Sequence, residues 1–62
     1  MMKVRRIRAG EYIVEMEGKE MFYIVKDKWG WIIGKIVGDE VKPIGYASIK
    51  RDAIDFVRRH YQ

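Results

Sequence analysis

The residues of this chain that could do chemistry are aromatic rings and lysines spaced along its middle section. They offer π-faces and positive charge, and no nucleophile accompanies them. Rings that stack on exposed bases, flanked by cations that neutralise phosphates, are the groups with which proteins hold nucleic acids. The set comprises Phe22, Lys26, Trp31, Lys35, Lys42 and Tyr46.

Patterns typical of enzymes are nearly absent. The chain has one Ser, at position 48, one His, at position 60, and no Cys. No Gly-rich phosphate loop and no metal-ligand spacing occurs. We therefore expect a protein that is not an enzyme, with no catalytic residue, no metal site and no small-molecule cofactor.

Alternating apolar residues separated by turn signals predict four strands. Pro43 cannot donate a ladder hydrogen bond, so the last of these strands is expected at an edge of the sheet. The expected strands are 11–17, 20–26, 31–37 and roughly 40–46, and the expected turns are Glu17-Gly18, Asp27 to Gly30 and Gly38-Asp39. Trp29 falls in the second turn, where an exposed ring would indicate binding and a tucked one a minor core residue.

After Ala47 the apolar period becomes helical, and Ser48 is expected to cap a helix. Its apolar stripe is Ile49, Ala53, Phe56, Val57 and Tyr61. Residues 1–9 form either a flexible basic arm or an extra edge strand, in which an Ala9-Gly10 turn would place Arg8 opposite Glu11. We predict an α+β fold over 1–62 as a single domain: a four-stranded antiparallel meander, with or without this fifth strand, and one C-terminal helix on one face.

Pairing the strands through these turns divides the side chains into two sets, because successive residues point to opposite faces. The set expected beneath the helix is Tyr12, Val14, Met16, Met21, Tyr23, Val25, Ile32, Gly34, Ile36, Val41, Pro43 and Gly45. The set expected on the helix-free face is Ile13, Glu15, Phe22, Ile24, Lys26, Trp31, Ile33, Lys35, Lys42, Ile44 and Tyr46. Both sets are largely apolar and one helix covers one face, so we expect the other face to be an interaction surface. A slip of one residue in any hairpin would exchange the faces of that strand.

Thirteen basic residues against nine acidic ones give a net charge of +4, which suits contact with phosphates. We expect a nucleic acid, DNA or RNA, to bind the helix-free face and the basic N-terminus. The expected contacts are Lys3, Arg5, Arg6, Arg8, Lys26, Trp31, Lys35, Lys42 and Tyr46. The alternative is a homodimer or a protein-partner module, since so small a core rarely supplies more than ~3–5 kcal/mol by itself. Its interface would be Phe22, Ile24, Trp31, Ile33 and Ile44.

No apolar run approaches the ~18 residues that span a membrane, and the charged N-terminus lacks the apolar stretch of a secretory signal. A soluble, cytoplasmic protein with no membrane partner is the expectation. Charged residues make up 35% of the chain, and Asn is absent. This composition is typical of thermophile proteins, and compositional bias of the genome would produce it equally well.

The segment from Trp31 to Tyr61 resembles the small arm-site DNA-binding domains of tyrosine recombinases, found in phage and transposon integrases. The resemblance lies in a Trp that opens a strand, a short Gly turn, a return strand, and the run from Ser48 to Ile54 leading the helix. It implies a three-stranded sheet whose face away from the helix enters the DNA major groove. That implication would direct Lys26, Trp31, Lys35, Lys42 and Tyr46 toward DNA. Similar tails recur in small proteins of bacteria, archaea and their viruses, so a viral origin is also compatible.

Overall fold

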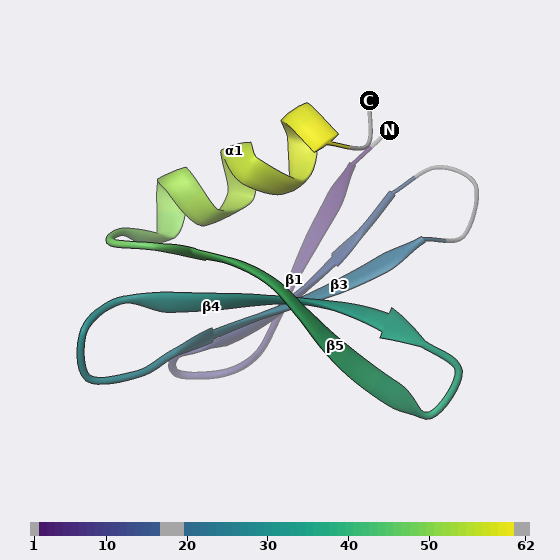
Figure 1. Ribbon diagram of the computed structural model, residues 1–62, viewed down its shortest axis with the longest axis horizontal. Helices are drawn as coiled ribbons and strands as arrows, with labels where there is room; N and C mark the ends of the chain where they lie inside the picture. The colour runs from purple at the N-terminus through teal and green to yellow at the C-terminus, as the bar shows by residue number, and fades with distance from the viewer. Residues whose placement is uncertain (1, 17–19, 61–62) are drawn as a thin grey trace.

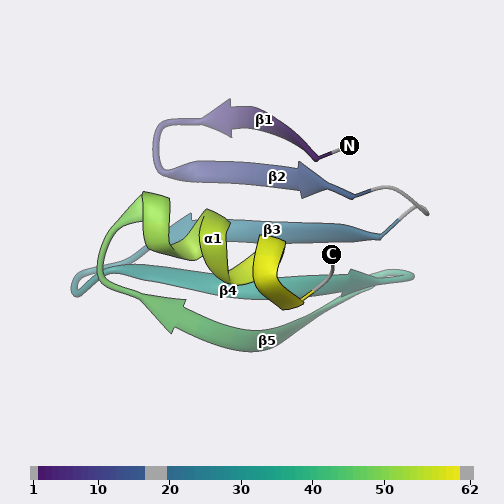
Figure 2. The same cartoon turned by 90° about the horizontal axis from the view of Figure 1, so that it is seen from above.

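The computed structural model describes residues 2–16 and 20–60, and it shows a five-stranded antiparallel sheet followed by one helix. The elements are β1 (Lys3–Arg8), β2 (Glu11–Glu15), β3 (Met21–Lys26), β4 (Trp31–Val37), β5 (Glu40–Ala47) and α1 (Lys50–His60). The strands follow one another across the sheet in chain order, and α1 lies over one face (Figure 1, Figure 2). The predicted α+β meander with a C-terminal helix is confirmed, and residues 3–8 form the fifth strand.

Helix α1 begins later than the sequence predicts. The carbonyl of Ile49 accepts the first helical hydrogen bond, from the N–H of Ala53 at 3.2 Å, so Ile49 takes the cap position expected for Ser48. Arg58 and Arg59 lie in the last turn, where positive charge complements the helix dipole. Tyr61 of the predicted stripe lies outside the described residues. The described part of the chain contains no helix with the length and apolarity that a membrane crossing requires, and cytoplasmic location stays a prediction.

The core lies between α1 and the sheet face beneath it, which we call the helix face. Helix α1 packs against β3, β4 and β5, and Figure 2 shows β1 outside its footprint. Each buried aliphatic or aromatic side chain contributes roughly 1.5–3 kcal/mol. The fully buried apolar side chains of the described residues are Val14, Phe22, Ile24, Ile33, Ala53 and Val57.

The expected assignment of sheet faces is wrong for β3, for β4 and for the part of β5 before Ile44. In β5, Val41 and Pro43 lie on the side away from the helix and Lys42 on the side of the helix. Phe22, Ile24 and Ile33 were expected to be helix-free, and all three are fully buried beneath α1. Trp31 and Ile44 pack half-buried against the same core. The opposite side, which we call the open face, carries Ile13, Met21, Tyr23, Val25, Ile32, Gly34, Ile36, Val41, Pro43 and Tyr46.

A one-residue error in the first predicted hairpin contributes to this difference. Val14 pairs with Phe22, whereas a two-residue turn at Glu17-Gly18 would have paired it with Met21. The hairpin closes instead with a hydrogen bond from the N–H of Met16 to the carbonyl of Glu20, at 2.8 Å. Residues 17–19 themselves lie outside the described residues. Since the slip is one residue, Val14 shares its face with the even-numbered residues of β3.

A β-bulge in β5 lets α1 approach the sheet closely. Ile33 pairs with Gly45 and Gly34 pairs with Pro43, so Ile44 is the extra residue. The bulge turns Gly45 toward α1, where a Cβ would lie 2.6 Å from the ring of Phe56. Gly45 therefore lies beneath the helix as expected. Gly34, expected there too, lies on the open face beneath Val41.

Candidate nucleic-acid interface

The predicted nucleic-acid contacts do not share one face. Lys26 and Trp31 are direct cross-strand neighbours on the helix face, near the start of α1. Lys35 and Lys42 pair with each other toward the other end of the sheet. Tyr46 lies on the open face, because the bulge reverses its direction. This distribution does not match the single reading face that the resemblance to arm-site domains implies.

The basic residues of β1 are exposed and partly neutralised. Arg5 forms an ion pair with Glu15 at 3.1 Å, and Arg8 forms one with Glu11 at 3.3 Å. Arg6 points to the helix face, opposite Tyr12, and Lys3 pairs with Glu15 in the strand register. Two of the four predicted cations of this strand therefore already have carboxylate partners. The sequence prediction of Arg8 opposite Glu11 is confirmed.

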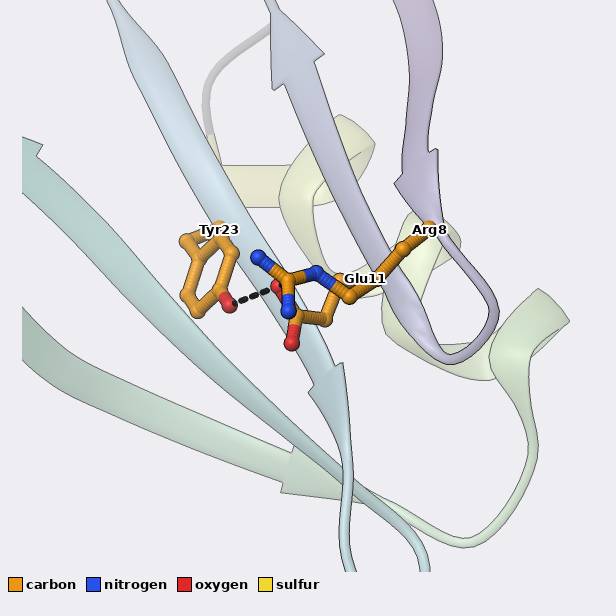
Figure 3. Close-up of polar contacts among 3 residues, drawn as sticks. All are labelled: Arg8, Glu11 and Tyr23. Atoms are coloured by element: carbon orange, nitrogen blue, oxygen red, sulfur yellow. Dashed lines mark hydrogen bonds and ion pairs between the residues drawn. The ribbon is translucent and has the colours of Figure 1, made fainter.

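Glu11 joins the basic strand to the open face (Figure 3). Its carboxylate accepts a hydrogen bond from the hydroxyl of Tyr23 at 2.8 Å, while Arg8 contacts the same oxygen. The bond to Glu11, helped by partial burial and by the carboxylate charge, raises the pKa of Tyr23 above its usual value of 10.0. Tyr23 therefore stays a neutral donor at physiological pH, and this edge of the open face carries matched charges.

Aromatic rings and lysines converge at the end of the sheet where the β1–β2 and β3–β4 turns and the start of α1 lie together (Figure 1, Figure 2). The rings of Tyr12 and Trp31 are 5.9 Å apart and tilted by 51°. The Nζ of Lys50 lies 4.5 Å from the centre of the Tyr12 ring and donates to its hydroxyl at 3.3 Å. We call this region the lysine–aromatic end, and it comprises Tyr12, Lys26, Lys28, Trp29, Trp31 and Lys50.

Trp29 is the most exposed large apolar side chain of this end, at 79%. It sits on a braced turn, because the Oδ1 of Asp27 accepts hydrogen bonds from the N–H groups of Trp29 at 2.9 Å and Gly30 at 3.0 Å. The hydroxyl of Tyr46 donates to the same oxygen at 3.0 Å. A further bond runs from the N–H of Asp27 to the carbonyl of Gly30, at 2.8 Å. The turn therefore holds the backbone of Trp29 in a defined position and leaves its indole exposed.

These bonds set the charge state of the turn. The N–H of Trp29, followed by the donors from Tyr46 and Gly30, lowers the pKa of Asp27 below its usual 3.8. Partial loss of hydration, and then the bond to Asp27, raise the pKa of Tyr46 above 10.0. At neutral pH Asp27 is thus an acceptor for all three donors.

Acidification should loosen this turn. Because the folded-state pKa of Asp27 is below its unfolded value, its stabilising effect is complete above about pH 3.8 and is lost as the pH falls through the folded pKa. We expect the amide resonances of Trp29 and Gly30 to titrate below pH 3.8 in NMR spectra. Asp27→Asn, which keeps an acceptor oxygen and does not ionise, should leave them flat. Titration at or above 3.8, or equal titration in the variant, would contradict this account.

The lysines of this end have no acidic partners among the residues described. Within 2–16 and 20–60, no carboxylate lies at ion-pair distance from Lys26, Lys28 or Lys50, and Lys28 instead extends over the Trp29 ring at 6.0 Å. Lys35, by contrast, pairs with Glu20 at 3.0 Å. Lysines without carboxylate partners are available to neutralise phosphates, which releases the counterions condensed on a nucleic acid.

Sequence reasoning found Lys26 and Trp31 and omitted Tyr12, Lys28, Trp29 and Lys50 from the site. Tyr12 was expected on the face beneath the helix, and it does pack half-buried against that core. Lys50 reaches Tyr12 from a distant part of the chain, which no local pattern reveals. Trp29 had a usable signal, because an Asp two residues before it and a Gly directly after it predict a turn that displays the residue between them.

Among the described residues no group of three or more potential metal ligands comes together. No protein-family model, curated protein or solved structure matches the chain.

Proposed function

We propose that this protein is a non-enzymatic nucleic-acid-binding protein that holds single-stranded DNA or RNA at its lysine–aromatic end. The observation that carries the proposal is the braced, 79% exposed Trp29. An indole exposed to this extent is accessible for stacking, and each base stacked on such a ring contributes ~1–3 kcal/mol. Lys26, Lys28 and Lys50 supply positive charge around it.

Single strands suit this geometry better than a duplex. The bases of a duplex are stacked on one another, and a ring at the tip of a turn reaches bases that are already unstacked. The sheet face away from the helix, which enters DNA in arm-site domains, is here apolar. We therefore base the proposal on the turns at one end of the sheet, and not on the mode of binding that the resemblance implies.

Trp29→Ala should weaken binding to a labelled oligonucleotide by roughly 5- to 150-fold, the equivalent of one lost stacking contact at ~1–3 kcal/mol. Fluorescence anisotropy against single-stranded and duplex probes measures it. Trp29→Phe, which keeps a ring, should recover part of the loss. Equal affinity of wild type and Trp29→Ala for every probe would reject the proposal.

The contribution of the lysines can be measured from the salt dependence of the binding affinity. Lys28→Ala should reduce the slope of log affinity against log salt by about 0.7, the value for one phosphate contact on a single strand. Lys42→Ala is the matched control, because Lys42 is exposed at the other end of the sheet. Equal slopes for the two variants would show that the charge acts non-specifically.

A further inference from the structure

The open face has the properties of a buried surface and is not covered in the structure. Cross-strand register arranges it in apolar rows over β3, β4 and β5. One row runs Tyr23, Gly34, Pro43, a second runs Met21, Ile36, Val41, and a third runs Val25, Ile32, Tyr46. No Lys, Arg, Asp or Glu of these three strands points to this side. An apolar surface of this extent on a small protein marks an interaction site.

A shallow hollow of about 250 Å³ lies in the middle of the open face. Its floor is Gly34, where a Cβ would lie 2.5 Å from Cγ1 of Val41. Tyr23 supplies the one side-chain polar group of the lining, and its hydroxyl already bonds Glu11. The hollow is smaller than the ~300–1,000 Å³ of small-molecule sites and lacks their convergent polar groups. It is suited to an apolar side chain from a protein surface.

We propose that the open face binds the open face of a second copy of this chain, sheet against sheet, in a two-fold symmetric dimer. The whole molecule extends over 31 × 24 × 20 Å, which limits a sheet face, rim included, to on the order of 600 Å² per copy. Two copies would therefore reach at most the lower end of the ~1,200–2,000 Å² that stable interfaces bury. Packed sheets of this kind interdigitate their inner side chains about 10 Å apart.

Charge complementarity favours a second copy over another partner. The rim of the open face over β1 and β2 carries two Arg–Glu pairs, Arg5 with Glu15 and Arg8 with Glu11. Lys3 lies on the same rim, opposite Glu15, so the rim presents both signs with a small positive excess. A two-fold axis sets the same patch against itself, so each arginine can meet a glutamate of the other copy without repulsion.

The dimer also explains how so small a chain would be stable. Of the residues described, six have apolar side chains that are fully buried in the monomer, and these lie between α1 and the sheet. A single core of this size rarely supplies more than ~3–5 kcal/mol, and small domains often gain the remainder by oligomerisation. The lysine–aromatic end lies outside the open face, so the inference is independent of the proposed function and a dimer would present two such ends.

Ile32→Glu tests the inference, because Ile32 lies on the open face between Val25 of β3 and Tyr46 of β5. Val37→Glu is the matched control: Val37 is on the same strand, 47% exposed, and its side chain points to the other side of the sheet. We expect wild type and Val37→Glu to sediment as dimers. Ile32→Glu should raise the dimer dissociation constant at least about 30-fold, the loss of one interface hot spot.

Circular dichroism would show whether Ile32→Glu folds, and Val41→Glu, at an exposed position of β5, provides a second variant of the same face. If the wild type is monomeric at every concentration tested, the proposed dimer is wrong, and the open face would instead bind a different protein. Dimers that persist in both open-face variants overturn it as well. Loss of dimerisation in Val37→Glu as strongly as in Ile32→Glu would show that the open face is not the interface. The Trp29 binding assay is read separately, so either proposal can fail alone.

Discussion

Phe22→Ala should abolish most of the stability of this protein, whereas Tyr23→Ala, at the next residue of β3, should cost far less. Phe22 is fully buried beneath α1, and its truncation removes both its transfer free energy and the packing around it, about 3–5 kcal/mol. That loss equals the entire stability that a core of this size typically provides. Tyr23 is half-buried on the open face and loses mainly its bond to Glu11.

Urea unfolding followed by circular dichroism measures both variants. The comparison should be made in the Ile32→Glu background, so that self-association does not contribute to the measured free energy of unfolding. A larger loss for Tyr23→Ala than for Phe22→Ala would mean that α1 covers the other face of the sheet. Equal losses would mean that both faces are buried in the monomer. Either result would remove the open face on which the dimer depends.

The sequence predicted the element order and most of the pairing, because strand alternation and turn residues are local signals. The turn at 27–30 gave the correct register of β3 with β4, and Gly38-Asp39 gave that of β4 with β5 as far as the bulge. The predicted register of β2 with β3 was wrong, because the sequence around Glu17-Gly18 does not determine the length of the connection between the two strands. One residue of error is enough to exchange the faces of a strand.

The choice of covered face could not be made from local pattern, because both faces are apolar. The covered face is the one whose side chains pack best against α1. The helix face combines the bulky side chains of Phe22, Ile24 and Ile33 with Gly45, over which Phe56 fits. Gly45 points to that face because of the bulge at Ile44, and no sequence motif predicts this bulge. Contacts between the helix and the sheet, such as that of Lys50 with Tyr12, depend on which face the helix covers, so they could not be predicted before that face was known.

Gly30→Ala should damage both the fold and the binding surface, because Gly30 is buried where β5 passes the 27–30 turn. A Cβ at this position would lie 2.4 Å from the carbonyl oxygen of Ala47 and 3.0 Å from the ring of Tyr46. The first contact is with backbone, so relief requires the end of β5 to move. We expect the free energy of unfolding to fall by about 1–3 kcal/mol, as for other overpacked sites.

The same displacement should reach Trp29. Moving Tyr46 removes its bond to Asp27, and Asp27 positions the N–H groups that hold Trp29 in place. We therefore expect Gly30→Ala to weaken oligonucleotide binding several-fold even under conditions in which the protein remains folded. Anisotropy titrations at a temperature well below the unfolding midpoint separate this effect from loss of stability.

Gly38→Ala is the control for a glycine substitution as such. Gly38 has a φ of 61°, and a Cβ added there would meet no described atom within 4 Å, so its cost is backbone strain of about 1 kcal/mol with no clash. It lies in the β4–β5 turn, at the end of the sheet away from Trp29, and should bind oligonucleotides like wild type. If Gly30→Ala also binds like wild type while its stability falls, the position of Trp29 does not depend on this turn. The indole would then act as a mobile group, and preorganisation would have no part in its affinity.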